Sequence, residues 1–158
     1  MCIKVKDLKN LNEDQYTNYF EKLKKQIKNT DANFIILNGK ANSGKTTIAT
    51  KIAEYASLNE KLQTIFFSLE ISKNTIKERI KEYTDYLTIY DKPIIIEDMI
   101  SKIKEEKPKF VVIDYLQLIG FDKSKCLSRN EELELIKEDL KNLSNELNIK
   151  ILVTSICR

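Results

Sequence analysis

Short apolar runs alternate along this chain with longer segments in which apolar residues recur every three or four positions. Runs of four to seven apolar residues that end at polar or turn-forming residues are typical of strands buried on both faces. The sequence contains five such segments. They lie at residues 33–38, 63–69, 87–90, 109–119, where only the first part is expected to be a strand, and 149–154.

The segments between these runs have the periodicity of helices. A capping box of Asn12 and Gln15 begins the first of them, and a second capping box, Ser128 with Glu131, begins the last. A loop without periodicity, residues 120–130, precedes the last helix. The expected helices are residues 12–28, 46–56, 72–83, 97–106 and a fifth from Ser128 through Leu147.

Strands that alternate with helices, each strand apolar throughout, imply a mostly parallel sheet with helices on both faces. The sequence therefore predicts an α/β fold, a three-layer sandwich around a sheet of about five strands. In such sheets ligands bind beyond the carboxyl ends of the strands. The residues that follow each strand are thus the first candidates for a functional site.

The composition narrows the class of protein. The chain has 158 residues, of which 42% are hydrophobic and 32% charged, and this suits one globular unit with a sizeable core. No apolar run approaches a membrane span, and the amino terminus lacks the apolar segment of a signal peptide. The absence of histidine excludes Ser-His and Cys-His catalysis and His-ligated zinc. Three cysteines without paired spacing favour free thiols in a reducing cytoplasm, and the net charge of +3 is too small to indicate nucleic acid by itself.

The first strand is followed by GKANSGKTT, residues 39–47, which matches the phosphate-loop pattern G-x-x-x-x-G-K-[ST]. Glycine is needed where backbone N–H groups converge on phosphate oxygens, and the helix that follows aims its positive end at the same anion. Lys45 is expected to contact the β and γ phosphates, and the Thr46 hydroxyl is suited to Mg²⁺. The expected phosphate-binding residues are Gly39, Lys40, Ala41, Asn42, Ser43, Gly44, Lys45, Thr46 and Thr47.

Three other strands end in polar residues that suit the same site. Asp114 follows four apolar residues and is a candidate ligand of Mg²⁺, although a turn-forming aspartate is the alternative. Glu70 follows the second strand, where a carboxylate can deprotonate the attacking water or can be an exposed residue at the start of a helix. Thr154 and Ser155 follow the fifth strand and are candidates for sensing the γ-phosphate.

The segments that follow the phosphate loop resemble, in sequence and in order, the C-terminal motor domain of DnaB-type replicative helicases. The matching segments are FFSLEIS, VVIDYLQLI and SRNEELELIKEDLKNLSNELNIKILVTSICR. The resemblance covers residues 33–158 and implies a RecA-like fold, ATP with Mg²⁺, and a homohexameric ring that translocates on single-stranded DNA and unwinds duplexes together with other replication proteins.

The resemblance assigns roles to individual residues. It places Lys45 and Thr46 at the phosphates and the metal, Glu70 at the attacking water, and Asp114 at Mg²⁺. It further implies that the loop 120–130 faces the central channel of the ring, where basic side chains meet the DNA backbone. The basic residues of this segment are Lys123, Lys125 and Arg129.

The sequence departs from the family in three places. Ser155 stands where the family has glutamine, the family's motor domain continues past the position of Arg158, and we expect no separate N-terminal domain of the kind that binds primase in the family. The helix 12–28 stands where the family has a linker helix that docks on a neighbouring subunit. We therefore expect residues 1–30 to form a linker-like helical segment, which either docks on a neighbour or packs on its own sheet. Residues 31–158 are expected to form the RecA-like ATPase core without the family's C-terminal portion.

Three functions therefore remain open. The first is a helicase motor, whose hydrolysis is impaired by the missing segment. The second is a nucleotide-binding module that regulates a helicase ring or docks on it, and the third is a phosphate-loop kinase. Such enzymes close an arginine-rich lid over the phosphates, and this chain has only three scattered arginines, Arg79, Arg129 and Arg158.

Overall fold

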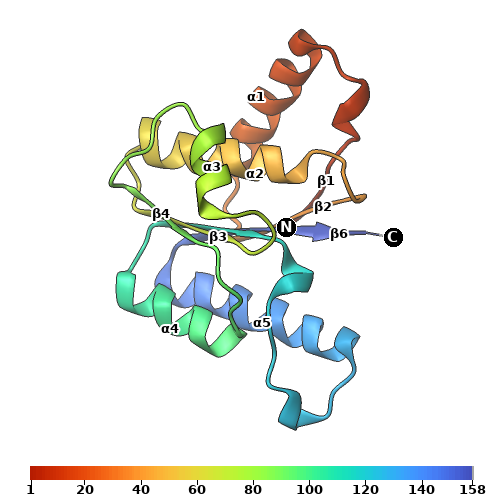
Figure 1. Cartoon of the computed structure of the whole chain (residues 1–158), viewed down its shortest axis with the longest axis vertical. Coiled ribbons are helices and arrows are strands. Elements are labelled where there is room, and N and C mark those ends of the chain that lie inside the picture. Colours follow the sequence, from red (N-terminus) through yellow and green to blue (C-terminus); the bar gives the residue numbers. More distant parts are fainter. Residues whose placement is uncertain (158) are drawn as a thin grey trace.

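The computed structural model describes residues 1–157, which form one six-stranded parallel sheet between two layers of helices (Figure 1). The strand order is β1-β2-β6-β5-β3-β4, and all five pairings are parallel. The predicted α/β three-layer sandwich is confirmed. The strands are β1 (Cys2–Lys4), β2 (Phe34–Gly39), β3 (Thr64–Ser68), β4 (Leu87–Tyr90), β5 (Phe110–Asp114) and β6 (Lys150–Ile156).

Helices cover both faces of the sheet, as Figure 1 shows. On one face, α1, α2 and α3 bury side chains such as Leu23, Ile48 and Ile76. On the other face α4 and α5 bury Ile103 and Leu140. The helices are α1 (Glu13–Asn29), α2 (Lys45–Glu54), α3 (Lys73–Arg79), α4 (Ile96–Glu106) and α5 (Arg129–Leu147).

The sequence missed one strand. The predicted number was about five, and the sixth is β1, which pairs with β2 in the register Ile3 to Leu37. Ile3 and Val5 are buried, while the lysines between and after them are exposed. This alternation is the period-two pattern of a strand with one buried face, but it extends over so few residues that it does not stand out from a coil.

The first helix packs on its own sheet. Both predicted capping boxes are present, at Asn12 with Gln15 and at Ser128 with Glu131. In α1, Leu23 and Ile27 are buried in the same core cluster as α2 and the sheet. Residues 1–30 therefore contribute a strand and a helix to the fold.

Several helix and strand ends differ from the predicted ones. The helix predicted over 72–83 ends at Arg79, because Ile80 is extended and buried in the core. The helix α2 continues beyond Glu54 as a π-helix over Tyr55–Asn59. The segment 109–119 is a strand only as far as Asp114 and then turns into a 3₁₀-helix, Leu116–Leu118.

Candidate functional site

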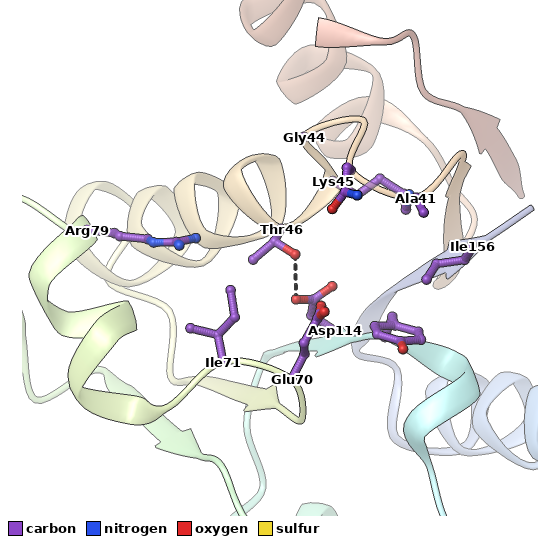
Figure 2. Close-up of a pocket in the computed structure, with 11 residues that line it drawn as sticks. Ala41, Gly44, Lys45, Thr46, Glu70, Ile71, Arg79, Asp114 and Ile156 are labelled. Atoms are coloured by element: carbon purple, nitrogen blue, oxygen red, sulfur yellow. Dashed lines mark hydrogen bonds between the residues drawn. The ribbon is translucent and has the colours of Figure 1, made fainter. Parts of the chain in front are cut away.

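A cavity of about 360 Å³ lies at the carboxyl ends of the strands, where the sequence predicted a ligand site. It is lined by the loop before α2, the segment from β3 into α3, and the ends of β5 and β6 (Figure 2). Strand register brings these segments together, since Ser68 of β3 is opposite Asp114 of β5. The lining residues are Ala41, Asn42, Gly44, Lys45, Thr46, Glu70, Ile71, Arg79, Asp114, Tyr115 and Ile156.

The loop before α2 has the backbone that its glycines allow. Gly44 caps α2 with a φ of 97°, a left-handed conformation that L side chains rarely adopt. A Cβ at Gly44 would also lie 2.8 Å from Cδ1 of Leu8. Glycine at this position is therefore required by the helix start and by the packing of Leu8, and the sequence interpretation had attributed it to the approach of a phosphate alone.

Lys45 is folded into this loop. Its side chain is buried, and its Nζ donates to the carbonyl oxygen of Gly39 at 2.9 Å, to that of Lys40 and to Oγ of Ser43 at 3.3 Å. Burial lowers the pKa of the Lys45 ammonium, while the acidic groups Cys157, Asp114 and Glu70 act in the opposite direction. The loop thus holds the Lys45 ammonium close to the amino-terminal end of α2.

A chain of hydrogen bonds fixes the carboxylate of Asp114, which is 1% exposed. The Thr46 hydroxyl donates to Oδ2 at 2.9 Å, and the Thr154 hydroxyl donates to Oδ1 at 2.6 Å (Figure 2 draws the first). Asp114 and Thr46 are thus in direct contact across the cavity. Thr154 is fully buried and reaches only the carboxylate and the Ile113 carbonyl, so it has no access to a γ-phosphate.

The donors at this point fit a magnesium ion. Mg²⁺ prefers carboxylate and hydroxyl oxygens and is usually held by one or two carboxylates together with substrate phosphates. Thr46 and Asp114 supply such a pair within 2.9 Å. Over residues 1–157 there is no group of three His, Cys, Asp or Glu side chains that could hold an ion alone.

The remaining cavity walls contain residues that the sequence placed and residues that it missed. Glu70 is exposed, lines the cavity, and forms no hydrogen bond through its carboxylate within the described part of the chain. Arg79 and Ile71 line the wall away from Ile156 (Figure 2). The sequence treated Arg79 as one of three scattered arginines. Its position at the end of the helix that follows Glu70 was the feature of the sequence that could have placed it near the site.

Other predicted positions are not in the cavity wall. Within the loop, Gly39, Lys40 and Ser43 contact the Lys45 amine, and Thr47 is exposed. Ser155 is nearly buried, and its Oγ accepts a hydrogen bond from Nε2 of Gln117 at 3.1 Å. Gln117, which the sequence did not single out, also bonds the backbone of Ile156 in both directions. Arg158 lies outside the described residues.

Two of the predicted DNA-contacting residues, Lys123 and Lys125, belong to a 3₁₀-helix between β5 and α5, and the third, Arg129, is the first residue of α5. Arg129 is committed to its own chain: its guanidinium donates to Glu132 at 2.7 Å and to the carbonyl oxygens of Gln117 and Ile119 at 2.8 Å each. Lys123 and Lys125 form long ion pairs, 3.7 Å to Glu132 and 3.8 Å to Glu97, and their side chains are 82% and 53% exposed. The Lys125 ammonium also lies 5.2 Å from the centre of the Phe121 ring.

Comparison with known proteins identifies the family. The model of the DnaB-like helicase C terminal domain matches residues 17–88 and 80–158. A probable replicative DNA helicase of Trieres chinensis is 28% identical over 78% of this chain and 35% of its own length. The replicative DNA helicases DnaB of Treponema pallidum and Leifsonia xyli are 26% and 29% identical, over 79% and 77% of this chain and 36% and 34% of theirs.

The chain spans about a third of the length of these curated relatives. None of the helices over residues 1–157 is long and apolar enough to cross a membrane. The matched segments include the phosphate loop, Glu70, Asp114 and β6. By this match and by its parallel sheet with a phosphate loop after β2, the chain belongs to the RecA-like C-terminal domain family of DnaB-type replicative helicases.

Proposed function

We propose that this chain binds and hydrolyses ATP with Mg²⁺ as the motor domain of a DnaB-like helicase that translocates on single-stranded DNA. The proposal rests on one observation: three groups line the same cavity. They are the phosphate loop with its buried Lys45, the Thr46–Asp114 pair, and the free carboxylate of Glu70. Each element matches one requirement of phosphoryl transfer to water.

The phosphate loop supplies the binding energy for the triphosphate. The N–H groups at the start of α2 and the positive end of that helix favour an anion beyond Gly44. Lys45 exchanges its bonds to the loop carbonyls for bonds to phosphate oxygens. Charge-assisted bonds of this kind are stronger than those to neutral carbonyls, so the exchange favours the bound state.

Thr46 and Asp114 hold the metal, and Glu70 acts on water. When bound, Mg²⁺ neutralises the charge that develops on the β and γ phosphates. Glu70 lies on the opposite wall from Lys45, is exposed, and has no competing partner in the described chain, so it is suited to accept a proton from a water aimed at the γ-phosphate. Arg79 also lines the cavity and adds a second cation to it.

The DNA-binding part of the proposal depends on the segment between β5 and α5. Lys123 and Lys125 are available to contact phosphates, because their ion pairs are long and their own side chains are exposed. Arg129, although part of the same expected set, is better suited to hold the segment in place. Its bonds to Gln117 and Ile119 connect the segment to the end of β5.

A second candidate is a regulatory module that binds nucleotide but hydrolyses it slowly. Among the described lining residues, only Lys45 and Arg79 are cationic, and Ser155 is turned toward Gln117. A motor would therefore depend on cations from a neighbouring subunit. Such residues accelerate related reactions by orders of magnitude.

ATP turnover measured with and without single-stranded DNA, over a wide range of protein concentration, tests the two candidates. The motor predicts a rate per molecule that rises with concentration, as subunits assemble, and rises again with DNA. The regulatory module predicts measurable ATP binding with a flat rate near zero. Absence of ATP binding itself would refute both.

A further inference from the structure

A second cavity lies at the opposite end of the sheet from the nucleotide site. Its volume is about 140 Å³, and it is enclosed by α1, the end of α2 with its π-helix, and the first residues of β5 and β6. Its inner wall is apolar, formed by Ile27, Ile52, Ala56 and Phe110, each of which is at most 6% exposed. An empty apolar space of this size holds a six-carbon ring, since an engineered cavity of about 150 Å³ binds benzene.

The rim of this cavity is cationic. Three lysines line it against a single acidic residue, Glu60, which lies 3.8 Å from Lys28. Lys24 donates to Glu21 at 2.9 Å, and its ammonium lies 4.2 Å from the ring centre of Tyr55. The rim therefore carries a net positive charge next to an apolar interior.

Lys150 is the cation without an acidic partner. No carboxylate lies within 4 Å of its ammonium in the described chain, and its Nζ donates to the carbonyl oxygens of Thr30 at 2.8 Å and Ala32 at 3.3 Å. An ammonium has three donors, so one N–H remains for a ligand. Burial lowers the pKa of Lys150, and only the more distant Asp31 opposes this effect. An anion in the cavity would relieve that cost.

We propose that this cavity binds a small aromatic carboxylate, with its ring between Ile52 and Phe110 and its carboxylate on Lys150. A cavity that was only a packing gap would be lined by aliphatic side chains, whereas three of the ten lining residues here are lysines. The π-helix Tyr55–Asn59 is a second indication, because π-helical turns are rare and are frequent at functional sites.

The position of the cavity gives the ligand a route to the nucleotide site. The helix α2 begins with Lys45 and Thr46 in the nucleotide cavity, and its last turn, with Ile52, and the π-helix that follows it line this second cavity. The two sites thus share one rigid element. Ligand binding itself does not depend on the proposed ATPase function, so the two proposals fail independently.

Benzoate is the probe, and methyl NMR of the full chain is the measurement. Benzoate is expected to shift the methyl signals of Ile27, Ile52 and Leu62 in a saturable manner, with a dissociation constant on the order of 1 mM. Benzamide, which has the same shape without the charge, is expected to bind about tenfold more weakly. Lys150→Met should reduce benzoate affinity to the benzamide level and leave benzamide unaffected.

Two further variants separate this site from others. Ala56→Leu fills the cavity and should abolish the shifts while the ammonium remains, and Ile52→Phe does the same if the π-helix does not tolerate leucine. Lys45→Ala removes the anion site of the phosphate loop and should leave benzoate binding unchanged. Shifts that disappear in Lys45→Ala, shifts that persist when the cavity is filled, or no saturable shift at all would each overturn the proposal.

Discussion

Replacing Thr154 with valine tests whether its buried hydrogen bond holds in place the Asp114 carboxylate, which we propose as a magnesium ligand. Valine has nearly the shape of threonine, so packing between β5 and β6 is preserved and only the hydroxyl is lost. Both carboxylate oxygens are occupied in the folded protein, one by Thr154 at 2.6 Å and one by Thr46 at 2.9 Å. The variant therefore leaves one oxygen of a nearly buried carboxylate without a donor.

The expected loss follows from the kind of bond. Hydrogen bonds to charged groups contribute about 1.5–3 kcal/mol, and a short, fully buried one belongs in that range. For a domain of this size the corresponding fall in melting temperature is about 3–12 °C. The matched control is Thr50→Val. Thr50 is also buried, but its hydroxyl donates to the Thr46 carbonyl four residues back, a neutral bond within the helix whose loss should cost less than about 1 kcal/mol.

The assay is urea unfolding of both variants in the presence of EDTA, so that no metal compensates for the missing donor. Unchanged denaturant slopes would show that the two variants expose the same surface on unfolding. If Thr154→Val and Thr50→Val lose equal stability, the carboxylate does not depend on Thr154, and the reasoning is wrong.

Four other predictions concern single residues. Lys45→Ala should weaken ATP binding by about 10- to 100-fold by calorimetry, because a buried charge-assisted contact is lost; unchanged affinity would contradict the phosphate-loop assignment. Glu70→Gln should keep ATP binding and lower turnover by about 10²–10⁴-fold, and normal turnover would exclude Glu70 as the base. Arg129→Lys should lower the free energy of unfolding by about 1–2 kcal/mol, because lysine cannot reproduce its three contacts, and a urea midpoint equal to wild type would refute the loop-holding role. Burial, and then the 2.5 Å bond to Glu106, raise the pKa of Tyr90 from 10.0 to about 12. The folded state holds that proton more tightly, so stability is lost as the pH rises from about 10 to 12; Tyr90→Phe should lose less over this range in urea titrations, and equal losses would contradict the assignment.

The phosphate loop was predictable because its requirements are local. A strand, two glycines, a lysine and a helix follow one another within fifteen residues, so the whole pattern can be recognised in one short segment of the sequence. Glu70 and Asp114 were predictable for a related reason. In a parallel sheet the carboxyl ends of strands share one edge, so residues after different strands converge.

The roles of Thr154, Gln117 and Arg79 were not predictable in the same way. Thr154 reaches Asp114 because β5 pairs with β6 in the register Ile113 to Val153, which the order of segments does not reveal. Gln117 bonds Ser155 across the same pair. Arg79 lines the cavity because α3 stops early and Ile80 turns inward. Each depends on how distant segments pack, and a periodic pattern carries no such information.

The central place of β6 has a consequence for how the protein folds. β6 joins two ladders, β1-β2 on one side and β5-β3-β4 on the other. The phosphate loop follows β2 in the first ladder, while Glu70 and Asp114 belong to the second. Residues 150–156 pair with both ladders and thereby place the phosphate loop beside the strand ends that precede Glu70 and contain Asp114. Because each ladder alone contains only part of the proposed site, a form of the protein in which β6 is unpaired should not bind nucleotide, and nucleotide binding would then report on the long-range pairing of β6.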